Sequence, residues 1–407
     1  MSSVESSRAT GPSNGGWLER RFQITARGST VSRELLGALA TFLTLSYILF
    51  VQPNVMAIPL SLGGTASPEE LATFRASVLT GLCIASAVAC VLMGLLSNFP
   101  VALAPAMGHN FFFSYAVCLG MGFTWQQALA ANLISGVLFL TLSLLGLWLP
   151  GIDPRRMLFN AIPRGLQHAI AVGIGLLIAL VGFEYAGLVI AQPGTYIGLG
   201  IGKVPWTHLV VSFLGLLTFG FFWAKKIKGA PLWAILVAAA AGLALGVVKP
   251  PTGVVDVPTL SATAFQLDFG GLFALSPKAV CVAIATFLFL DVFDTVGTLA
   301  GVRHRAGLVS KEGELDRGVG GAFVADAAGT VAGAALGTST ITSYVESLAG
   351  ITSGARTGLC ALGVAALFLL GMFFAPLMAV VAEAQVVTLA GPGNVTVFLY
   401  PCLARVV

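Results

Sequence analysis

The chain has 407 residues, of which 57% are hydrophobic and only 9% charged, and its mean hydropathy is +0.93. This balance excludes an ordinary soluble domain, in which roughly a quarter of the residues are charged. The net charge of +4 forms no basic patch, and the six cysteines and four histidines are scattered, which argues against a nucleic-acid partner, a bound metal and a disulfide framework.

Runs of about 20 apolar residues recur along the chain and predict an all-α polytopic membrane protein. Residues 1–27 are polar and rich in Ser and Gly, and they predict a disordered cytoplasmic tail rather than a signal peptide. Residues 28–150 then hold four predicted spans, at 34–57, 76–96, 98–118 and 126–148.

The third of these spans is predicted to be broken. Pro100 and Pro105 interrupt it, and proline is poorly tolerated inside a helix. An extended piece that leads into a half-helix from about Gly108 therefore fits better than a continuous helix.

The first repeat is predicted to continue with residues 151–248, which hold spans five to seven, at 165–189, 208–223 and 230–248. Residues 28–150 and 278–381 are the predicted halves of one domain, and residues 151–248 are the first half of another. A loop at 249–277 is polar enough to lie outside the membrane. Residues 278–381 hold spans eight to eleven, at 279–302, 318–335, 337–350 and 357–381.

The tenth span, GTSTITSYVESLAG (337–350), is similar to the third, because a lead-in of small residues precedes a short helix. Twelve-residue stretches of the first and eighth spans, ATFLTLSYILFV (40–51) and ATFLFLDVFDTV (285–296), match at six of twelve positions. Because the copies start seven spans apart, they are predicted to have opposite orientations in the membrane. Inverted repeats with broken helices are typical of transporters, although chance similarity between apolar segments is the alternative.

The basic residues predict the orientation. With a cytoplasmic N-terminus and alternating sides, the outer side holds four of the 21 Lys and Arg residues and the cytoplasmic side the other 17. The positive-inside rule supports this topology.

Two aspartates, Asp291 and Asp294, lie three residues apart in the eighth span and so share one helix face. A carboxylate in a membrane span is expensive and usually functional, but a helix-packing hydrogen bond is the alternative. Asp326 in the ninth span has only small neighbours, and we expect it to make a structural hydrogen bond.

Glu346 lies about one turn into the tenth-span half-helix, where burial and the helix dipole act on its carboxyl group in opposite directions. This position suits a proton relay. Asn110 opens the opposing half-helix and is either a ligand contact or a helix N-cap. Together with small hydroxyls such as Thr340 and Ser343, these groups suit a neutral molecule with several N–H donors, or a cation.

Four motifs carry a resemblance to a known family. GSTVSRELLGALATFLTLSYILFVQPNVM, APAMGHNFFFSY, FDTVGTLAG and GTSTITSYVESLAGITSGARTGL, in this order, resemble the AzgA-like purine permeases of the nucleobase–ascorbate transporter superfamily, over about residues 22–380. The resemblance implies proton-coupled import of hypoxanthine, guanine and adenine across the plasma membrane. An enzyme with a cofactor is not expected, because the sequence shows no nucleophile–base set and no metal cluster. It also implies two inverted repeats of seven spans that form a core and a gate, with the core moving past the gate as an elevator.

By the same resemblance, Asn110, Asp291 and Glu346 contact the substrate, and Asp294 and Glu346 couple transport to protons. Ser343 and Thr340 are further substrate-binding candidates from the residue chemistry alone. The expected partners are a purine nucleobase, a proton and the lipid bilayer, and a homodimer is an option.

The family pattern continues with three more spans, whereas residues 382–407 predict at most one poor span, at about 385–401. The second half of the gate is therefore expected to be incomplete. This leaves an alternative function, in which a transport-inactive form binds purine or associates with a full-length relative. Uracil, xanthine and cytokinin-like adenine derivatives are alternative substrates.

Overall fold

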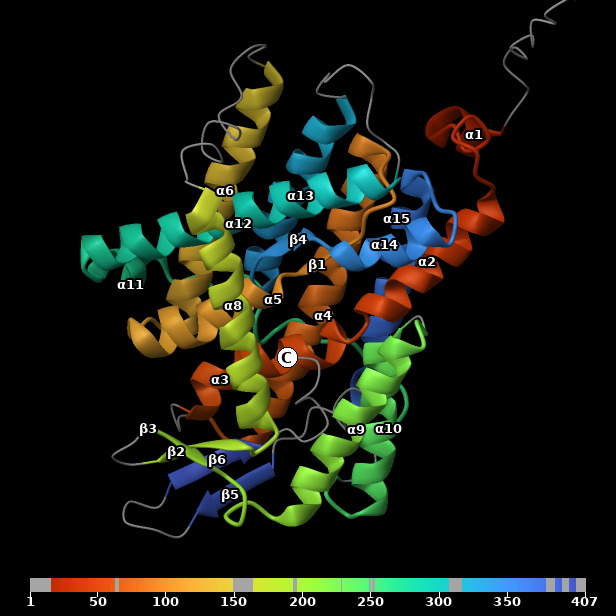
Figure 1. Ribbon diagram of the computed structural model, residues 1–407. Coiled ribbons are helices and arrows are strands. Elements are labelled where there is room, and N and C mark those ends of the chain that lie inside the picture. The colour runs from red at the N-terminus through yellow and green to blue at the C-terminus, as the bar shows by residue number, and fades with distance from the viewer. Residues whose placement is uncertain are drawn as a thin grey trace, which may run out of the picture.

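A computed structural model shows the fold of the protein (Figure 1). It describes residues 16–62, 66–148, 164–192, 196–227, 229–248, 250, 253–306, 317–377, 385–389 and 395–399. Among these residues, seven helices are long and apolar enough to cross a membrane. They coincide with predicted spans one, two, four, six, eight, nine and eleven, which confirms the prediction of a mostly helical polytopic membrane protein.

The long helices begin with caps that the sequence supplies. The Thr30 hydroxyl accepts from the Arg33 N–H at the start of α2, and Ser67 and Glu70 form a reciprocal capping box at the start of α4. The spans of the first half are α2 (Val31–Leu45) with α3 (Ile48–Leu62), α4 (Pro68–Leu92) with η1 (Met93–Ser97), and α6 (Trp125–Trp148). Spans five to seven correspond to α8 (Arg164–Tyr185), α9 (Trp206–Ala224) and α10 (Ala230–Ala244). The continuous spans of residues 278–381 are α12 (Pro277–Ala306), α13 (Arg317–Leu336) and α15 (Gly358–Gly371) with η4 (Met372–Phe374).

Both predicted breaks are present. The third span consists of strand β1 (Leu103–Pro105), helix α5 (Met107–Phe111) and its continuation η2 (Phe112–Gly120). The tenth consists of strand β4 (Ile341–Ser343), the turn η3 (Val345–Ser347) and helix α14 (Leu348–Thr352). Each span is therefore half extended and half helical, and the two extended halves lie side by side in the middle of the helices (Figure 1).

The two strands satisfy each other's backbone. They pair antiparallel with Ala104 opposite Thr342, and the ladder continues with N–H bonds of 3.0 Å from Tyr344 to the Ala102 carbonyl and from Ala106 to the Thr340 carbonyl. Because hydrogen-bonded and non-bonded pairs alternate along an antiparallel ladder, the backbone groups of Leu103, Ile341 and Ser343 point outward.

Side chains of neighbouring helices close these outer edges. On α13, Asp326 accepts the Ser343 N–H at 2.7 Å, and the Thr330 hydroxyl lies 3.1 Å from the Ile341 carbonyl. On α4, the Cys90 thiol group lies 3.2 Å from the Leu103 nitrogen and 3.4 Å from its carbonyl. A two-stranded ribbon can therefore stand among membrane helices without orphaned edge groups at these positions.

Glycines allow the helices to approach the ribbon and one another closely. A Cβ on Gly81 of α4 would lie 2.5 Å from the Leu336 carbonyl, and one on Gly333 of α13 would clash with the Ser339 carbonyl. Helix α13 packs against α4 and α6, and α15 packs against α2 and α4. Small residues that permit such backbone contact are typical of helix interfaces in membranes.

A second group of elements packs beside these helices (Figure 1). It contains α8, the hairpin of β2 (Val189–Gln192) and β3 (Tyr196–Leu199), and the pair α9–α10. It touches the first group where α8 meets α5 and where α10 meets α2.

The C-terminal prediction of at most one poor span has a different outcome. The described residues there form a hairpin of β5 (Gln385–Leu389) and β6 (Val395–Leu399). Strand β6 contacts β2 and α8. Strand-forming residues such as Val and Thr explain this outcome.

The prediction of a disordered tail up to Arg27 is wrong for residues 16–27. Helix α1 (Trp17–Phe22) packs on the bundle, and Phe22 is fully buried against Leu359 and Leu362. The Asn98 side-chain amide donates to the Phe22 carbonyl at 3.0 Å, so polar groups of the tail also have partners.

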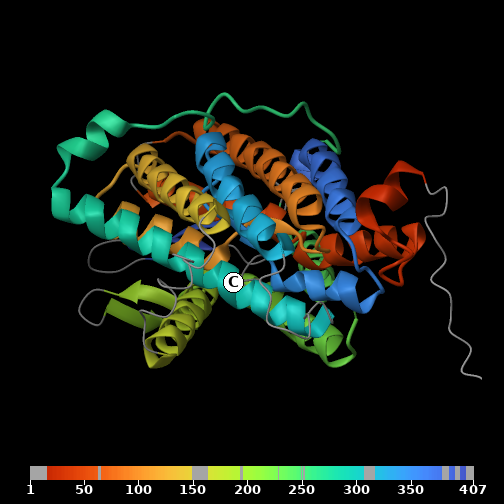
Figure 2. The ribbon, with the colours of Figure 1, turned by 90° about the horizontal axis from the view of Figure 1, so that it is seen from above.

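The predicted loop at 249–277 crosses the ends of several helices (Figure 2). In the described part of this loop, the Asp256 N–H donates to the Phe373 carbonyl at 3.0 Å, and the Phe265 N–H donates to the Ala335 carbonyl at 2.7 Å. It also contains a short helix, α11 (Phe269–Ala274), capped by Asp268. The loop therefore ties together the ends of α13 and of α15 with its extension.

The close approach at Gly333 can be tested. Gly333→Ala would place a methyl group against the Ser339 carbonyl, so α13 and the turn before β4 must move apart. We expect a loss of about 1–3 kcal/mol of stability, as for other overpacked sites, measured as a lower thermal midpoint of the protein purified in detergent.

Gly220→Ala in α9 is the matched control, because a Cβ there meets nothing within 4 Å. It should leave the midpoint unchanged or raise it, since alanine is favoured over glycine in a helix by roughly 0.5–1 kcal/mol. Equal midpoints for the two variants would contradict the packing described for Gly333.

Candidate functional site

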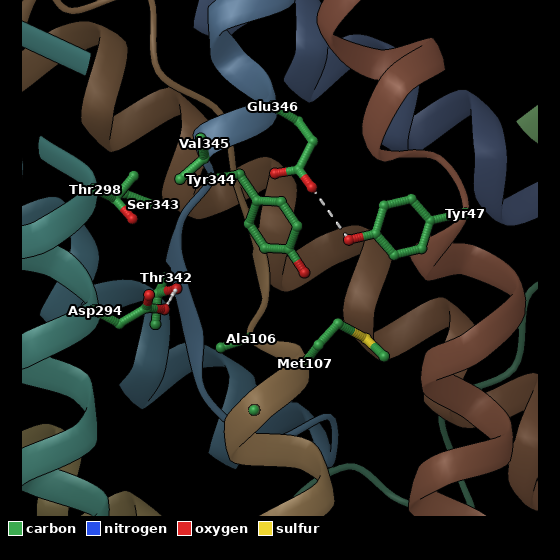
Figure 3. A pocket seen from close by; sticks show the side chains of 11 residues that line it. Tyr47, Ala106, Met107, Asp294, Thr298, Thr342, Ser343, Tyr344, Val345 and Glu346 are labelled. Carbon is green, nitrogen blue, oxygen red and sulfur yellow. Dashed lines mark hydrogen bonds between the residues drawn. The ribbon is translucent and has the colours of Figure 1, made fainter. Parts of the chain in front are cut away.

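A cavity of about 190 Å³ lies where the two broken spans meet (Figure 3). This volume is below the roughly 300–1,000 Å³ of drug-sized ligand sites, so it suits a small molecule. It is bounded by the break between α2 and α3, the start of α5, one side of α12, and the chain from β4 into η3. Its lining residues are Tyr47, Ala106, Met107, Gly108, Asp294, Thr298, Thr342, Ser343, Tyr344, Val345 and Glu346.

Glu346 reaches the cavity from the first turn after β4. The Tyr47 hydroxyl, which comes from the break between α2 and α3, donates to Glu346 Oε1 at 3.3 Å (Figure 3). The α2 helix ends at Leu45 and α3 begins at Ile48, so the break places the tyrosine on the cavity rather than along a continuous helix. Tyr47 therefore orients the carboxyl group of Glu346.

Asp294 reaches the cavity from α12. Its Oδ2 accepts from the Thr342 hydroxyl of β4 at 2.7 Å (Figure 3). The two carboxyl groups thus come from different elements and are each fixed by one hydroxyl group. Among the described residues that line the cavity there is no lysine, arginine or histidine.

The helix that starts at Met107 adds backbone donors. Ala106 is its N-cap and makes no side-chain cap, and the helix continues through η2 to Gly120. The first N–H groups of a helix have no partner within the helix. Because Gly108 lines the cavity and has no side chain, the backbone at this point is accessible to a ligand. The cavity therefore combines acidic acceptors with a smaller set of N–H donors.

Three of the predicted site residues line this cavity: Asp294, Ser343 and Glu346. The Ser343 hydroxyl and N–H both donate to Asp326 at 2.7 Å. Ser343 therefore lines the cavity but directs its polar groups toward α13.

The other predicted residues lie behind the cavity. Asn110 is fully buried, and its amide group pairs reciprocally with that of Gln52 on α3. The Thr340 hydroxyl donates to the Asn132 side-chain oxygen on α6 at 2.7 Å. These contacts join α5 to α3 and the lead-in of β4 to α6.

Asp291 also lies behind the cavity. Its Oδ2 is 2.9 Å from the Thr330 hydroxyl of α13, on the outer side of β4. The Thr295 hydroxyl bonds to Asp326 on the same side. The structural role expected for Asp326 is thus observed, because this residue holds the edge of β4 and bonds to α12.

Tyr47, Thr298, Thr342 and Tyr344 line the cavity but were missed by the sequence reasoning. Tyr47 and Tyr344 lie in the two segments already singled out as an internal echo and a broken span, and that position was the available signal. Gln52, the partner of Asn110, gave none, because it lies 58 residues away in an apolar run.

Comparison with known proteins gives a family. A model described as "Permease family" matches residues 32–397. The guanine/hypoxanthine permease PbuG of Bacillus subtilis is 40% identical over 365 residues, which cover 89% of this chain and 79% of that protein. The adenine permease AdeQ of Escherichia coli is 34% identical over 369 residues, covering 90% and 77%.

A solved structure with a similar fold is the transmembrane domain of a cyanobacterium bicarbonate transporter, BicA. It aligns with a TM-score of 0.59 at 13% identity, covering 92% of this chain and 86% of that one. At this identity the likeness concerns the fold alone.

The role of Asp326 can be tested by Asp326→Ala. This change leaves the buried Ser343 N–H and the Ser343 hydroxyl without their acceptor, while the Thr295 hydroxyl keeps the Asp291 carbonyl at 2.8 Å. We expect a loss of about 1–3 kcal/mol or more, as for other buried groups left unpaired, seen as a lower thermal midpoint in detergent.

Asp256→Ala serves as the control, because the Asp256 carboxylate accepts from the neighbouring Val257 N–H and lies in an exposed part of the loop. It should leave the midpoint nearly unchanged. A similarly small effect of Asp326→Ala would contradict the edge-closing role.

Proposed function

The chain belongs to the Permease family, and on this basis we propose that it imports purine nucleobases, such as hypoxanthine, guanine and adenine, together with protons. The relatives PbuG and AdeQ, named for guanine/hypoxanthine and for adenine, support the substrate class. The cavity supports it independently through its chemistry.

The observation that carries the proposal is the pair of carboxyl groups on one small cavity without a basic residue among its described lining. A carboxylate accepts hydrogen bonds only, and its two oxygens can take two adjacent N–H donors. A purine base offers such donors on its ring edges, and it also offers acceptors such as N7. In the proposed complex Glu346 and Asp294 accept from the N–H groups of the base, and the backbone at Met107 and Gly108 donates to a ring acceptor.

The remaining predicted residues support these contacts in the proposal. Asn110 holds α5 through Gln52, and Thr340 holds the lead-in of β4 through Asn132. Asp291 acts from behind β4. Tyr47 orients Glu346. In this conformation Asn110, Thr340 and Asp291 thus influence the substrate indirectly.

The proposed coupling of purine transport to protons rests on the charges of Asp294 and Glu346. Two carboxylates close to one another in a membrane interior are unfavourable unless a cation or a proton compensates them. In the proposal Asp294 and Glu346 share this task, and a bound purine stabilises the arrangement by donating to them. Substrate and proton then favour the same state.

The transport motion is proposed to be of the elevator type. The core contains α2–α6 and α12–α15, which pack through glycines and carry the cavity, and the gate contains α8–α10. Two seven-span repeats of opposite orientation, of which the second gate half is incomplete, fit the antiparallel pairing of β1 with β4. The core carries the cavity past the gate.

The proposed location is the plasma membrane, with a cytoplasmic N-terminus. The sidedness rests on the distribution of Lys and Arg between the loops. A homodimer is compatible with the exposed apolar residues of α9, among them Phe213, Leu217 and Phe221.

The first test is uptake of radiolabelled hypoxanthine, guanine and adenine by proteoliposomes with an inward proton gradient. Glu346→Gln and Asp294→Asn each remove a charge-assisted hydrogen bond, so we expect purine binding to weaken about 10- to 100-fold, the equivalent of roughly 1.5–3 kcal/mol. Uptake should fall accordingly.

Glu69→Gln is the matched control, because Glu69 lies at the exposed start of α4. It should leave uptake and binding unchanged. Purine binding by the unchanged protein without uptake would favour the transport-inactive alternative, and undiminished uptake by both cavity variants would refute the proposed site.

The orientation can be tested with Lys203→Cys and Lys225→Cys in a variant whose six native cysteines are replaced. The two positions are exposed and lie at opposite ends of α9. A thiol reagent that cannot cross the membrane should label position 203 in intact cells and label position 225 only after lysis. The reverse pattern would place the N-terminus outside.

A further inference from the structure

The carboxyl group of Asp291 is buried in an unusual way. The side chain is 1% exposed, its Oδ1 has no hydrogen-bond partner, and its Oδ2 lies 2.9 Å from the Thr330 hydroxyl. An ionised carboxylate would leave a charged oxygen buried without a donor, which is strongly unfavourable. A neutral acid would leave only a carbonyl oxygen unpaired, so the surroundings suit the protonated form of Asp291.

Asp326, which belongs to the same cluster, differs in this respect. It accepts from the Ser343 N–H and the Ser343 hydroxyl, and the Thr295 hydroxyl divides its one hydrogen between Asp326 and the Asp291 backbone carbonyl. Two or three donors stabilise an ionised carboxylate. Of these two buried acids, Asp326 has the surroundings of an ionised carboxylate, whereas Asp291 has the surroundings of a protonated acid.

Thr330 connects Asp291 to the strand. Its hydroxyl oxygen lies 2.9 Å from Asp291 Oδ2 and 3.1 Å from the Ile341 carbonyl of β4. A hydroxyl group has one hydrogen to donate, so it cannot serve both acceptors fully at once. If Asp291 is ionised, Thr330 donates to Asp291; if Asp291 is protonated, Asp291 donates to Thr330, which is then free to donate to Ile341.

We infer that Thr330 is a positioning residue that reports the protonation of Asp291 to strand β4, an inference that rests on the proposed function for its consequence in transport. A hydronium ion gives up one proton, so one of its O–H bonds breaks and leaves water, and an O–H bond forms at Asp291 Oδ2. The Thr330 hydroxyl then rotates from Asp291 to the Ile341 carbonyl, and no further covalent bond changes. The outer edge of β4 is then closed at Ile341 as well as at Ser343.

The hydrogen bond at Ile341 affects the cavity through the residues that follow it in the chain. It carries Thr342, which holds Asp294, and continues to Glu346, which Tyr47 orients. Protonation of Asp291 therefore fixes the strand on which the cavity depends and favours the ligand-binding arrangement. Proton and purine bind cooperatively through this strand without sharing an atom.

Other titratable groups lie near Asp291 and must be separated from it in any measurement. Asp294 lies on the same helix and Asp326 on α13, while Tyr344 and Glu346 follow β4 and His109 lies on α5. Helix α6, which also packs against α12, contributes no charged side chain in its described part.

The first experiment reads the proton directly by infrared spectroscopy of the purified full chain during a pH titration. A C=O stretching band of a protonated carboxylic acid is expected in the unchanged protein and should be absent in Asp291→Asn. In Thr330→Val, which keeps the shape but removes the hydroxyl, the band should shift in frequency and in its titration midpoint. Thr330→Ser should restore both.

The second experiment measures hypoxanthine binding at acid and alkaline pH. Coupled sites typically change one another's affinity about 5- to 150-fold, and we expect acid pH to strengthen binding by a factor in this range. The factor should fall toward one in Thr330→Val and return in Thr330→Ser. Thr141→Val is the control, because this exposed threonine of α6 donates to the Val137 carbonyl of its own helix.

The outcomes are distinct. If Asp291→Asn removes no band, or Thr330→Val leaves band and titration unchanged, the inference is wrong. If the bands behave as expected but the unchanged protein binds no purine, the proposed function fails and the proton site stands. If purine binds and the Thr330→Val protein keeps the full pH effect, Thr330 does not transmit protonation to the cavity.

Discussion

Every backbone N–H and C=O group at membrane depth needs a partner, because the hydrocarbon offers none. The two short extended segments β1 and β4 are where this constraint is hardest to meet. They meet it by pairing with each other and by taking side chains as partners for their outer edges: Cys90 for β1, and Asp326 and Thr330 for β4. Many of the buried polar side chains inside the bundle are there because the extended ribbon needs hydrogen-bond partners.

The ribbon also divides the acids into two groups. Asp294 bonds to the Thr342 hydroxyl and lines the cavity, whereas Asp291 and Asp326 are held on the side of α13. One short strand therefore lies between a ligand-facing carboxyl group and a buried carboxyl pair. In the coupling inferred above, a change in the hydrogen bonds on one side of this strand alters those on the other side, because the strand has three residues and is bonded along both edges. This is a physical basis for linking a proton to a ligand that never touches it.

The sequence predicted the spans and their breaks well, because hydrophobic runs and interior prolines act locally. Two acids that it singled out, Glu346 and Asp294, line the cavity, since an acid in the first turn of a half-helix or inside a span needs a polar environment. It could not show that Asn110 pairs with Gln52, or that Asp291 turns away while Asp294 does not, because both depend on long-range packing. The position of α1 likewise depends on the burial of Phe22 against Leu359 and Leu362 of α15. No local pattern in the polar tail predicts this contact.

The fold itself does not choose the ligand. A cyanobacterium bicarbonate transporter has a similar fold, and a cavity flanked by helix N-termini suits an anion, because unpaired N–H groups and helix dipoles favour negative charge. In this chain Asp294 and Glu346 line the cavity at the start of α5, and no basic residue among the described lining residues offsets them. Their charges oppose an anion and favour a ligand that brings its own N–H donors. A shared fold therefore does not fix the ligand, and the proposal for this chain depends on the side chains that line its cavity rather than on the architecture.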